Sequence, residues 1–310
     1  MTSGCRGGAL LFVLMAAPSL GRPVQAQDIV VTLLGTGSPT PAIDRFGPST
    51  LVQVNNQTLL FDVGRGAHQR LNQLGIDAVK VDAVFLTHLH SDHIVGIPDL
   101  WLTGWLITRR DRPWIVLGPA GTVSMAEHLA QAFAVDLPIR VEENRGTQPA
   151  AGGKFEARDI EPGVVYERNG VRVTAIKVDH GVIAPAYGYR IDYAGRSVVL
   201  SGDTTTSPAL LAAATDTSLL VHEIYQTSAE ALKSNPRLAN VQALHVDAVQ
   251  AGTLFARAKP KLAVYSHIVF RGADVAEVVR LTRTTYSGPL VVGEDLMQFI
   301  VGEDVAVLRR

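Results

Sequence analysis

The 310-residue sequence predicts one α/β domain, in which two packed sheets are covered by helices on both outer faces as a four-layer αββα sandwich. Three observations lead to this prediction. Short apolar runs alternate with helical stretches from residue 28 onward, and each half of the chain combines hairpin strands with helices. The sequence contains no repeat, low-complexity tract or linker that would divide it. We therefore expect a single domain over residues 27–310.

In the first half, apolar runs bounded by turn residues predict strands, and apolar residues at helical spacing predict helices. The predicted strands are residues 29–34, 50–54, 58–63, 83–87 and 114–117, and the predicted helices are residues 64–74, 99–108 and 123–134. The polar segment 142–153 contains Gly and Pro, which predicts a surface loop within the domain.

The second half begins with strands and ends mainly with helices. Two turns, Asn169-Gly170 and Ala194-Gly195, each predict a hairpin between apolar runs. The predicted strands are residues 164–167, 171–178, 187–193, 197–200 and 262–265, and the predicted helices are residues 246–258 and 273–282.

The N-terminal segment has the pattern of a secretory signal peptide. Arg6 precedes an apolar run over residues 9–17, and the small-residue pattern Val24-Gln25-Ala26 follows. The run is shorter than the roughly 20 residues that span a bilayer, so we expect no membrane anchor. These features predict cleavage after Ala26 and a secreted or periplasmic protein.

The charge balance argues against a nucleic-acid partner. The full chain has 28 basic and 29 acidic residues, and removal of residues 1–26 would leave 26 basic residues, a net charge of −3. A surface that binds nucleic acid is usually clearly basic. Cys5, the only cysteine, would leave with the signal peptide, which excludes disulfides, thiolate ligands and a cysteine nucleophile.

A cluster of potential metal ligands follows the predicted buried strand 83–87. The segment His88-Leu89-His90-Ser91-Asp92-His93 holds three imidazoles and one carboxylate, at the strand end where α/β proteins place their sites. Such side chains are costly to bury together without a cation. Imidazole nitrogens and carboxylate oxygens suit zinc, and two ions a few Å apart suit a bridging hydroxide. The segment predicts a metal site rather than a solvated loop.

This segment resembles the His-x-His-x-Asp-His motif of the metallo-β-lactamase superfamily. The other markers of the superfamily follow in order along nearly the whole chain: Phe61-Asp62-Val63-Gly64, Asp179-His180, Ser201-Gly202-Asp203 and Tyr265-Ser266-His267. The resemblance implies the metallo-β-lactamase fold and two Zn²⁺ ions, with Mn²⁺ and Fe²⁺ left open. The ligands that it implies are His88, His90 and His180 for one ion, Asp92, His93 and His267 for the other, and Asp203 as a bridge between both.

The resemblance also implies catalytic residues. Asp92 would serve catalysis as well as metal binding, and Glu223 would keep His245 protonated so that it protonates the leaving group. A helix-capping role for His245 stays open. Asp62 is expected to orient the ligands.

Within the superfamily, the sequence resembles the branch of ribonuclease Z and secreted arylsulfatases. The stretches 98–105 and 259–267 favour the arylsulfatases, and the long arm with which ribonuclease Z grips tRNA has no evident counterpart. Trp101 and Trp105 are expected either to wall an aromatic leaving group or to pack in the core.

We therefore expect a secreted arylsulfatase that acts through a metal-bridging hydroxide, on a small-molecule aryl sulfate or phosphate ester. The main alternative is a ribonuclease Z-like phosphodiesterase. A β-lactamase or lactonase-type hydrolase and a non-catalytic metal-binding protein are lesser alternatives. No nucleic-acid partner is expected, and a homodimer is left open.

Overall fold

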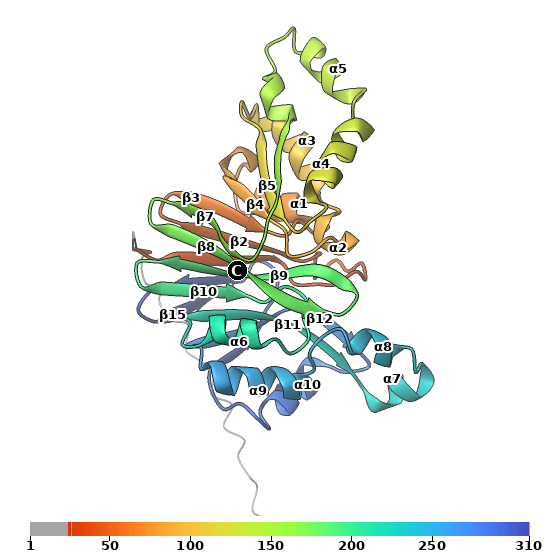
Figure 1. The fold of residues 1–310 in the computed structure, drawn as a ribbon, viewed down its shortest axis with the longest axis vertical. Coiled ribbons are helices and arrows are strands. Elements are labelled where there is room, and N and C mark those ends of the chain that lie inside the picture. The colour runs from red at the N-terminus through yellow and green to blue at the C-terminus, as the bar shows by residue number, and fades with distance from the viewer. Residues whose placement is uncertain (1–23, 26, 310) are drawn as a thin grey trace, which may run out of the picture.

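The computed structural model describes residues 24–25 and 27–309 (Figure 1). The predicted signal peptide and Cys5 lie outside the described residues, apart from Val24 and Gln25. Within the described part of the chain, no helix combines the length and apolar character needed to cross a membrane.

The first sheet has eight strands in the order β15-β14-β1-β2-β3-β4-β5-β6. In chain order the strands are β1 (Ile29–Gly35), β2 (Ser49–Val54), β3 (Gln57–Phe61), β4 (Ala83–Phe85), β5 (Trp114–Gly118), β6 (Phe155–Asp159), β14 (Gln298–Val301) and β15 (Val305–Leu308). The strands from β3 to β6 run parallel, whereas the other pairs are antiparallel. The carboxyl ends of β3 and β4 therefore meet at one edge of the sheet.

The second sheet has seven strands in the order β13-β12-β11-β10-β9-β8-β7. In chain order the strands are β7 (Gly163–Arg168), β8 (Val171–His180), β9 (Ile183–Tyr193), β10 (Arg196–Leu200), β11 (Leu219–Thr227), β12 (Leu262–Arg271) and β13 (Leu290–Val292). The strands from β10 to β13 run parallel, so the ends of β10, β11 and β12 also share one edge.

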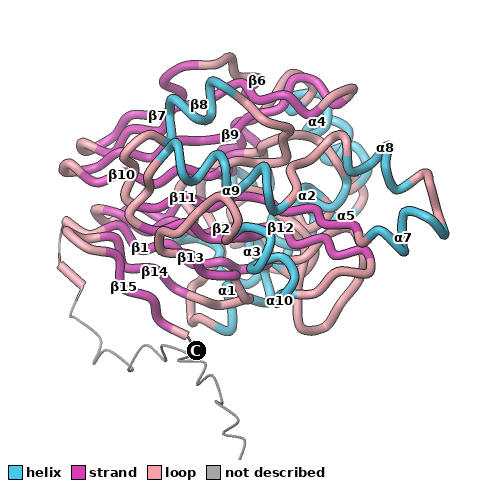
Figure 2. The backbone as a smooth tube through the Cα atoms, turned by 90° about the horizontal axis from the view of Figure 1, so that it is seen from below, coloured by secondary structure: helices cyan, strands magenta, loops and turns pink. Residues whose placement is uncertain are grey.

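The helices form the two outer layers. They are α1 (Ala67–Gln73), α2 (Ser91–Ile94), α3 (Ile97–Thr108), α4 (Thr122–Ala132), α5 (Asp136–Glu143), α6 (Pro208–Ala214), α7 (Ala229–Ser234), α8 (Leu238–Gln242), α9 (Ala248–Ala258) and α10 (Val275–Thr282), with short 3₁₀ turns η1 (Ala78–Lys80) and η2 (Ala150–Gly153). Figure 1 shows α1, α3 and α4 on one side of the sheets and α6, α9 and α10 on the other, and in Figure 2 α9 lies in front of β11, which it contacts.

Three apolar clusters hold these layers together. The largest lies between the sheets, where Phe61 and Phe85 of the first sheet meet Tyr189 of the second. A second cluster packs α6, α9 and α10 on the second sheet, and a third packs α1 and α3 on the first. Burial of apolar surface in three separate planes is what a four-layer sandwich requires. The predicted αββα fold is confirmed.

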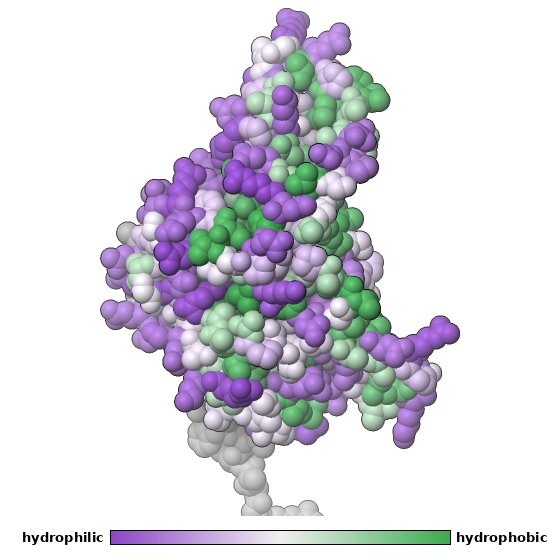
Figure 3. Space-filling view, viewed as in Figure 1, coloured by the Kyte–Doolittle hydropathy of each residue, from purple (hydrophilic) through white to green (hydrophobic). Residues whose placement is uncertain are grey.

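The segment 119–153 forms a protruding lobe, which the sequence did not predict. Figure 1 shows α5 at its tip, away from the sheets, and Figure 3 shows hydrophobic side chains on its surface, where Val135 and Ile139 are exposed. The predicted loop 142–153 is partly wrong, because it ends in η2. There Gly152 packs so closely on Arg110 that a Cβ would lie 1.7 Å from the Arg110 carbonyl oxygen.

Candidate active site

The predicted site residues come from both sheets and meet at one edge of the sandwich. The segment that begins at His88 follows β4 and leads into α2. From the second sheet, His180 ends β8, Asp203 follows β10, and His267 lies within β12. Because these ends share an edge, residues that are far apart in the sequence become neighbours.

The seven predicted ligands form two groups, each able to hold a metal ion. The ligand atoms within each group lie within 4.8 Å of one another, and the groups are His88, His90, His180 and Asp203, and Asp92, His93 and His267. Asp203 faces both groups. Its Oδ2 lies 3.9 Å from His88 Nε2 and 3.3 Å from His267 Nε2.

Several buried polar atoms of these groups make no hydrogen bond within the described chain. They are His93 Nε2, His180 Nε2, His267 Nδ1 and Asp203 Oδ1. A buried polar atom without a hydrogen bond is unfavourable, and a bound cation would satisfy those of them that bind it. The donor set of imidazole nitrogens and carboxylate oxygens fits zinc.

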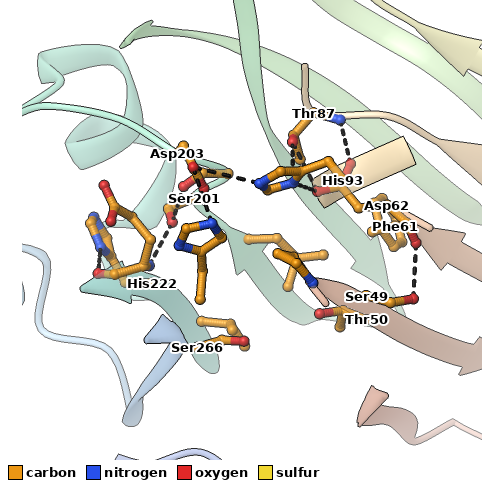
Figure 4. Close-up of a pocket in the computed structure, with 16 residues that line it drawn as sticks. Ser49, Thr50, Phe61, Asp62, Thr87, His93, Ser201, Asp203, His222 and Ser266 are labelled. Carbon is orange, nitrogen blue, oxygen red and sulfur yellow. Dashed lines mark hydrogen bonds and ion pairs between the residues drawn. The ribbon is translucent and has the colours of Figure 1, made fainter. Parts of the chain in front are cut away.

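Asp62 fixes the orientation of His93. Its Oδ2 accepts a hydrogen bond from His93 Nδ1 at 2.7 Å, and its two oxygens accept from the amide and hydroxyl of Thr87 at 2.8 and 2.9 Å. With Nδ1 held in this way, His93 Nε2 is directed toward Asp203, 3.5 Å away (Figure 4). The predicted orienting role of Asp62 agrees with this arrangement.

Two site residues adopt a left-handed backbone conformation. Asp62 has φ of 58° and His267 has φ of 43°, and His267 lies at a register shift between β11 and β12. Non-glycine residues rarely adopt such φ values, and those that do are concentrated at functional sites. The bulge at His267 directs its side chain to Asp92 and Asp203.

The electrostatics of the site favour the metal-binding form of His88 and Asp203 and the protonated form of His93 and His267. Burial, reinforced by repulsion from His93, lowers the pKa of His88 well below its ordinary value. Burial alone would raise the pKa of Asp203, but attraction to His267 and His93 outweighs it and the pKa lies well below the ordinary value. Burial alone would lower the pKa of His93, but Asp203 and Asp62 raise it well above its usual range. These carboxylates would equally attract a cation, which competes with the proton.

Glu223 and His245 form the predicted pair beside the metal-ligand groups. His245 Nδ1 donates to both carboxylate oxygens of Glu223 at 3.1 Å, and the imidazole stacks on Tyr225. Burial would lower the pKa of His245, but the hydrogen bond to Glu223 raises it above its ordinary value. The N-cap of α9 is Asp247, so His245 does not have the capping role that the sequence left open.

The structure also decides between two roles that the sequence left open for Trp101 and Trp105, and it adds residues that the motifs did not reveal. Trp101 and Trp105 are buried in the core at 0% and 1% exposure, so they do not wall the site. Thr87 Oγ1 lies 3.0 Å from His88 Nδ1, and the Leu244 carbonyl accepts from His180 Nδ1 at 2.9 Å. A backbone carbonyl that orients a histidine leaves no signal in a sequence.

Comparisons with known proteins agree with the family and the fold that the motifs implied. A family model described as anti-Pycsar protein Apyc1 matches residues 29–244. Ribonuclease Z of Mycobacterium marinum is 34% identical over 272 residues, which cover 86% of this chain and 97% of the relative.

Two solved structures share the fold. The metallo-β-lactamase fold protein YhfI from Bacillus subtilis has a TM-score of 0.69 at 18% identity, covering 88% of this chain and 99% of its own. The short form of human tRNase Z has a TM-score of 0.63 at 21% identity, with the same coverage of 88% and 99%.

The fold and the site together define a metal-dependent hydrolase that acts on ester bonds. The chain belongs to the metallo-β-lactamase superfamily, in the branch that contains ribonuclease Z and the anti-Pycsar protein Apyc1. The resemblance inferred from the motifs is confirmed at this level.

Proposed function

We propose that this chain is a phosphodiesterase of the ribonuclease Z type, with a dinuclear zinc centre at the seven ligand side chains. The observation that carries the proposal is the convergence of the two ligand groups on Asp203, beside the Glu223–His245 pair. The similarity to ribonuclease Z over 86% of the chain supports a phosphodiester substrate.

A phosphodiesterase is the alternative function that the sequence analysis gave, whereas its main expectation was an arylsulfatase. The motif details pointed to an arylsulfatase, but the relatives and structures named above include ribonucleases and no sulfatase. The expectation of no nucleic-acid partner is weakened for the same reason. The acidic balance of the chain still argues against a large nucleic acid as substrate.

Bound metal ions would supply Lewis-acid activation of water and of the phosphoryl group. The chain's own residues then set the geometry of the reaction. Asp62 and Thr87 hold His93, the Leu244 carbonyl holds His180, and burial of these side chains excludes bulk water from the ligand nitrogens. Ligands fixed in this way need little rearrangement during the reaction.

His245 is placed to protonate the leaving group. Glu223 occupies its Nδ1, so the proton available for transfer is the one on Nε2. Glu223 is itself held in place, because its Oε1 accepts from the Thr204 amide at 3.2 Å. The raised pKa of His245 favours the protonated imidazole, which is the form that a general acid requires.

Parallel kinetics with two chromogenic substrates test the function. The metal-reconstituted enzyme should hydrolyse bis-p-nitrophenyl phosphate with a much larger kcat/KM than p-nitrophenyl sulfate, since the two share a leaving group but not a central atom. The reverse order would establish the arylsulfatase. Activity on neither substrate would contradict both.

We also propose export as the cellular context, with residues 1–26 removed and residues 27–310 forming the single hydrolase domain. The support is the pattern from Arg6 to Ala26 in the sequence. N-terminal sequencing of the protein from the periplasm or medium should find Gln27 as the first residue. A protein that retains Met1 in the cytoplasm would overturn this proposal.

A further inference from the structure

A pocket of about 260 Å³ opens directly beside His245. It is bounded by α7, α8, the start of α9 and residues 205–206, and Figure 1 shows α7 and α8 at the lower right. We call it the leaving-group pocket, and its polar lining consists of Thr205, Thr206, Gln242, His245, Asp247 and Gln250.

The position of His245 indicates which part of the substrate the pocket would hold, namely the leaving group. If the proposed function holds, the proton on His245 Nε2 goes to the leaving oxygen. Glu223 covers Nδ1, and His180 lies on another side with its ring centroid 4.9 Å from that of His245. Because His245 also lines the pocket, the group attached to the leaving oxygen would then enter it.

The lining of the pocket has no positive side chain apart from His245. No Lys or Arg is among its described lining residues, whereas the Asp247 carboxylate is. Asp247 caps α9 by accepting from the amides of Val249 and Gln250 through Oδ1. An anionic leaving group would face this carboxylate with no Lys or Arg of the described lining to offset it, which is electrostatically unfavourable.

The lining instead offers neutral hydrogen-bonding groups. The side-chain amide of Gln242 makes no hydrogen bond to the described chain, and its Oε1 is buried without a partner. Gln250 uses only its Oε1, which accepts from the Asp247 amide. A buried amide oxygen without a partner favours a ligand that donates a hydrogen bond to it.

We propose that this pocket holds the leaving group of the phosphodiester and selects a neutral alcohol rich in hydrogen-bonding groups, as in a nucleoside, over an anionic group such as a phosphate. The volume of about 260 Å³ lies just below the roughly 300–1,000 Å³ of drug-sized sites, which suits a group of this size. Gln242 is the specificity-determining residue, and the carboxylate of Asp247 disfavours an anionic leaving group.

The hydrolysis replaces one oxygen on phosphorus by another. A water oxygen forms the new bond to phosphorus, and the bond from phosphorus to the leaving oxygen breaks. The leaving oxygen keeps the bonding pair and takes the proton from His245 Nε2, which yields the neutral alcohol. The proton that the water loses restores the imidazole through solvent.

Three substrates test the proposal on the zinc-loaded full chain: a dinucleoside monophosphate, a dinucleoside diphosphate and bis-p-nitrophenyl phosphate. Gln242→Ala should lower kcat/KM for the dinucleoside monophosphate, relative to bis-p-nitrophenyl phosphate, about tenfold through loss of hydrogen bonds. Asp247→Asn keeps a residue that caps helices well but removes the charge. This variant should raise kcat/KM for the diphosphate relative to the monophosphate about fivefold or more.

Gln131→Ala on α4 and Asp304→Asn between β14 and β15 are matched controls far from the site, and both substrate ratios should stay at the wild-type value. Unchanged ratios in Gln242→Ala and Asp247→Asn would overturn the pocket assignment, as would a wild-type preference for the diphosphate. Loss of the wild-type activity on bis-p-nitrophenyl phosphate is a separate outcome, because it would overturn the proposed function itself.

Discussion

At the scale of single residues, the orientation of the site histidines depends on which ring nitrogen is hydrogen-bonded to the rest of the protein. Asp62 holds His93 at Nδ1, and the Leu244 carbonyl holds His180 at Nδ1. In both residues the opposite nitrogen, Nε2, is the buried atom without a partner. The tautomer of each of these predicted ligands is thus set by a hydrogen bond outside the candidate metal centre.

Replacement of His245 by Ala should slow hydrolysis according to the leaving group. Esters with alkyl leaving groups need the proton and should lose roughly a hundredfold or more in kcat, while p-nitrophenoxide, which needs little protonation, should be barely affected. The measurement is a leaving-group series for wild type and His245→Ala, with His128→Ala on the exposed face of α4 as the control. Equal losses for all leaving groups would mean that His245 serves structure or metal binding instead.

His222 should make stability depend on pH. It is fully buried, its Nδ1 donates to the Glu223 carbonyl at 2.8 Å, and burial lowers its pKa. Because the unfolded state binds the proton more readily, stability should fall as pH drops below about 6.5, by at most about 1.4 kcal/mol per pH unit from this group.

Urea unfolding of the metal-free protein at several pH values checks this dependence. His222→Asn should flatten the loss of stability between pH 6.5 and the lowered pKa, and His128→Asn serves as the control. Parallel curves for wild type and His222→Asn would refute the effect.

Much of the site could be predicted from the sequence because its side chains leave strand ends within short motifs. The segment from His88 to His93 alone indicated a metal site, and the single residues His180, Asp203 and His267 gained weight from their places after predicted strands. Features that depend on how the backbone folds in three dimensions leave no pattern in the sequence. The left-handed φ of His267 and the Leu244 carbonyl are examples.

At the scale of secondary-structure elements, segments with a regular apolar pattern were predicted correctly, whereas segments that mix polar and apolar residues were missed. The strands β1 and β10 and the helix α9 agree with the prediction to within about two residues. β11 was missed as a strand although all nine of its residues are buried, because the polar residues His222, Glu223 and Gln226 interrupt its apolar pattern. The single-turn helix α2 is too short to show a helical period.

Gly64 packs against the segment from His88 to His93, which carries four of the predicted metal ligands. The residue before Gly64 is hydrogen-bonded to the end of that segment, since the Val63 amide donates to the His93 carbonyl at 2.7 Å. A Cβ at Gly64 would lie 2.4 Å from the carbonyl carbon of Gly47 and 2.7 Å from the Asp92 carbonyl oxygen. Side chains at such distances force backbone shifts.

Gly64→Ala should therefore destabilise the protein by about 1–3 kcal/mol and weaken zinc binding at the Asp92, His93 and His267 group. Gly75→Ala is the control, because Gly75 has φ of 69° and no neighbour within 4 Å. It should cost about 1 kcal/mol through backbone strain and leave zinc binding unchanged. Denaturant unfolding and zinc titration measure the two effects, and normal zinc affinity in Gly64→Ala would rule out the coupling.

At the scale of the whole molecule, the candidate metal centre joins the two sheets. His88 and His90 follow a strand of the first sheet, whereas His180 and Asp203 follow strands of the second. The second group likewise combines Asp92 and His93 with His267 of the opposite sheet. A metal ion bound by either group would therefore link the layers at the edge of the sandwich.

Removal of metal should consequently loosen the whole fold as well as abolish activity. Zinc at about 1,000 times its Kd would stabilise the native state by about 4 kcal/mol per site, which corresponds to a rise in Tm of roughly 10 °C for a domain of this size. Calorimetry of the chelated and the zinc-reconstituted protein measures the shift, and metal analysis should find two zinc ions per chain. Asp203→Ala removes the side chain that faces both groups and should abolish most of the shift. An equal Tm with and without metal in the wild type would mean that these side chains do not bind the ions that the site predicts.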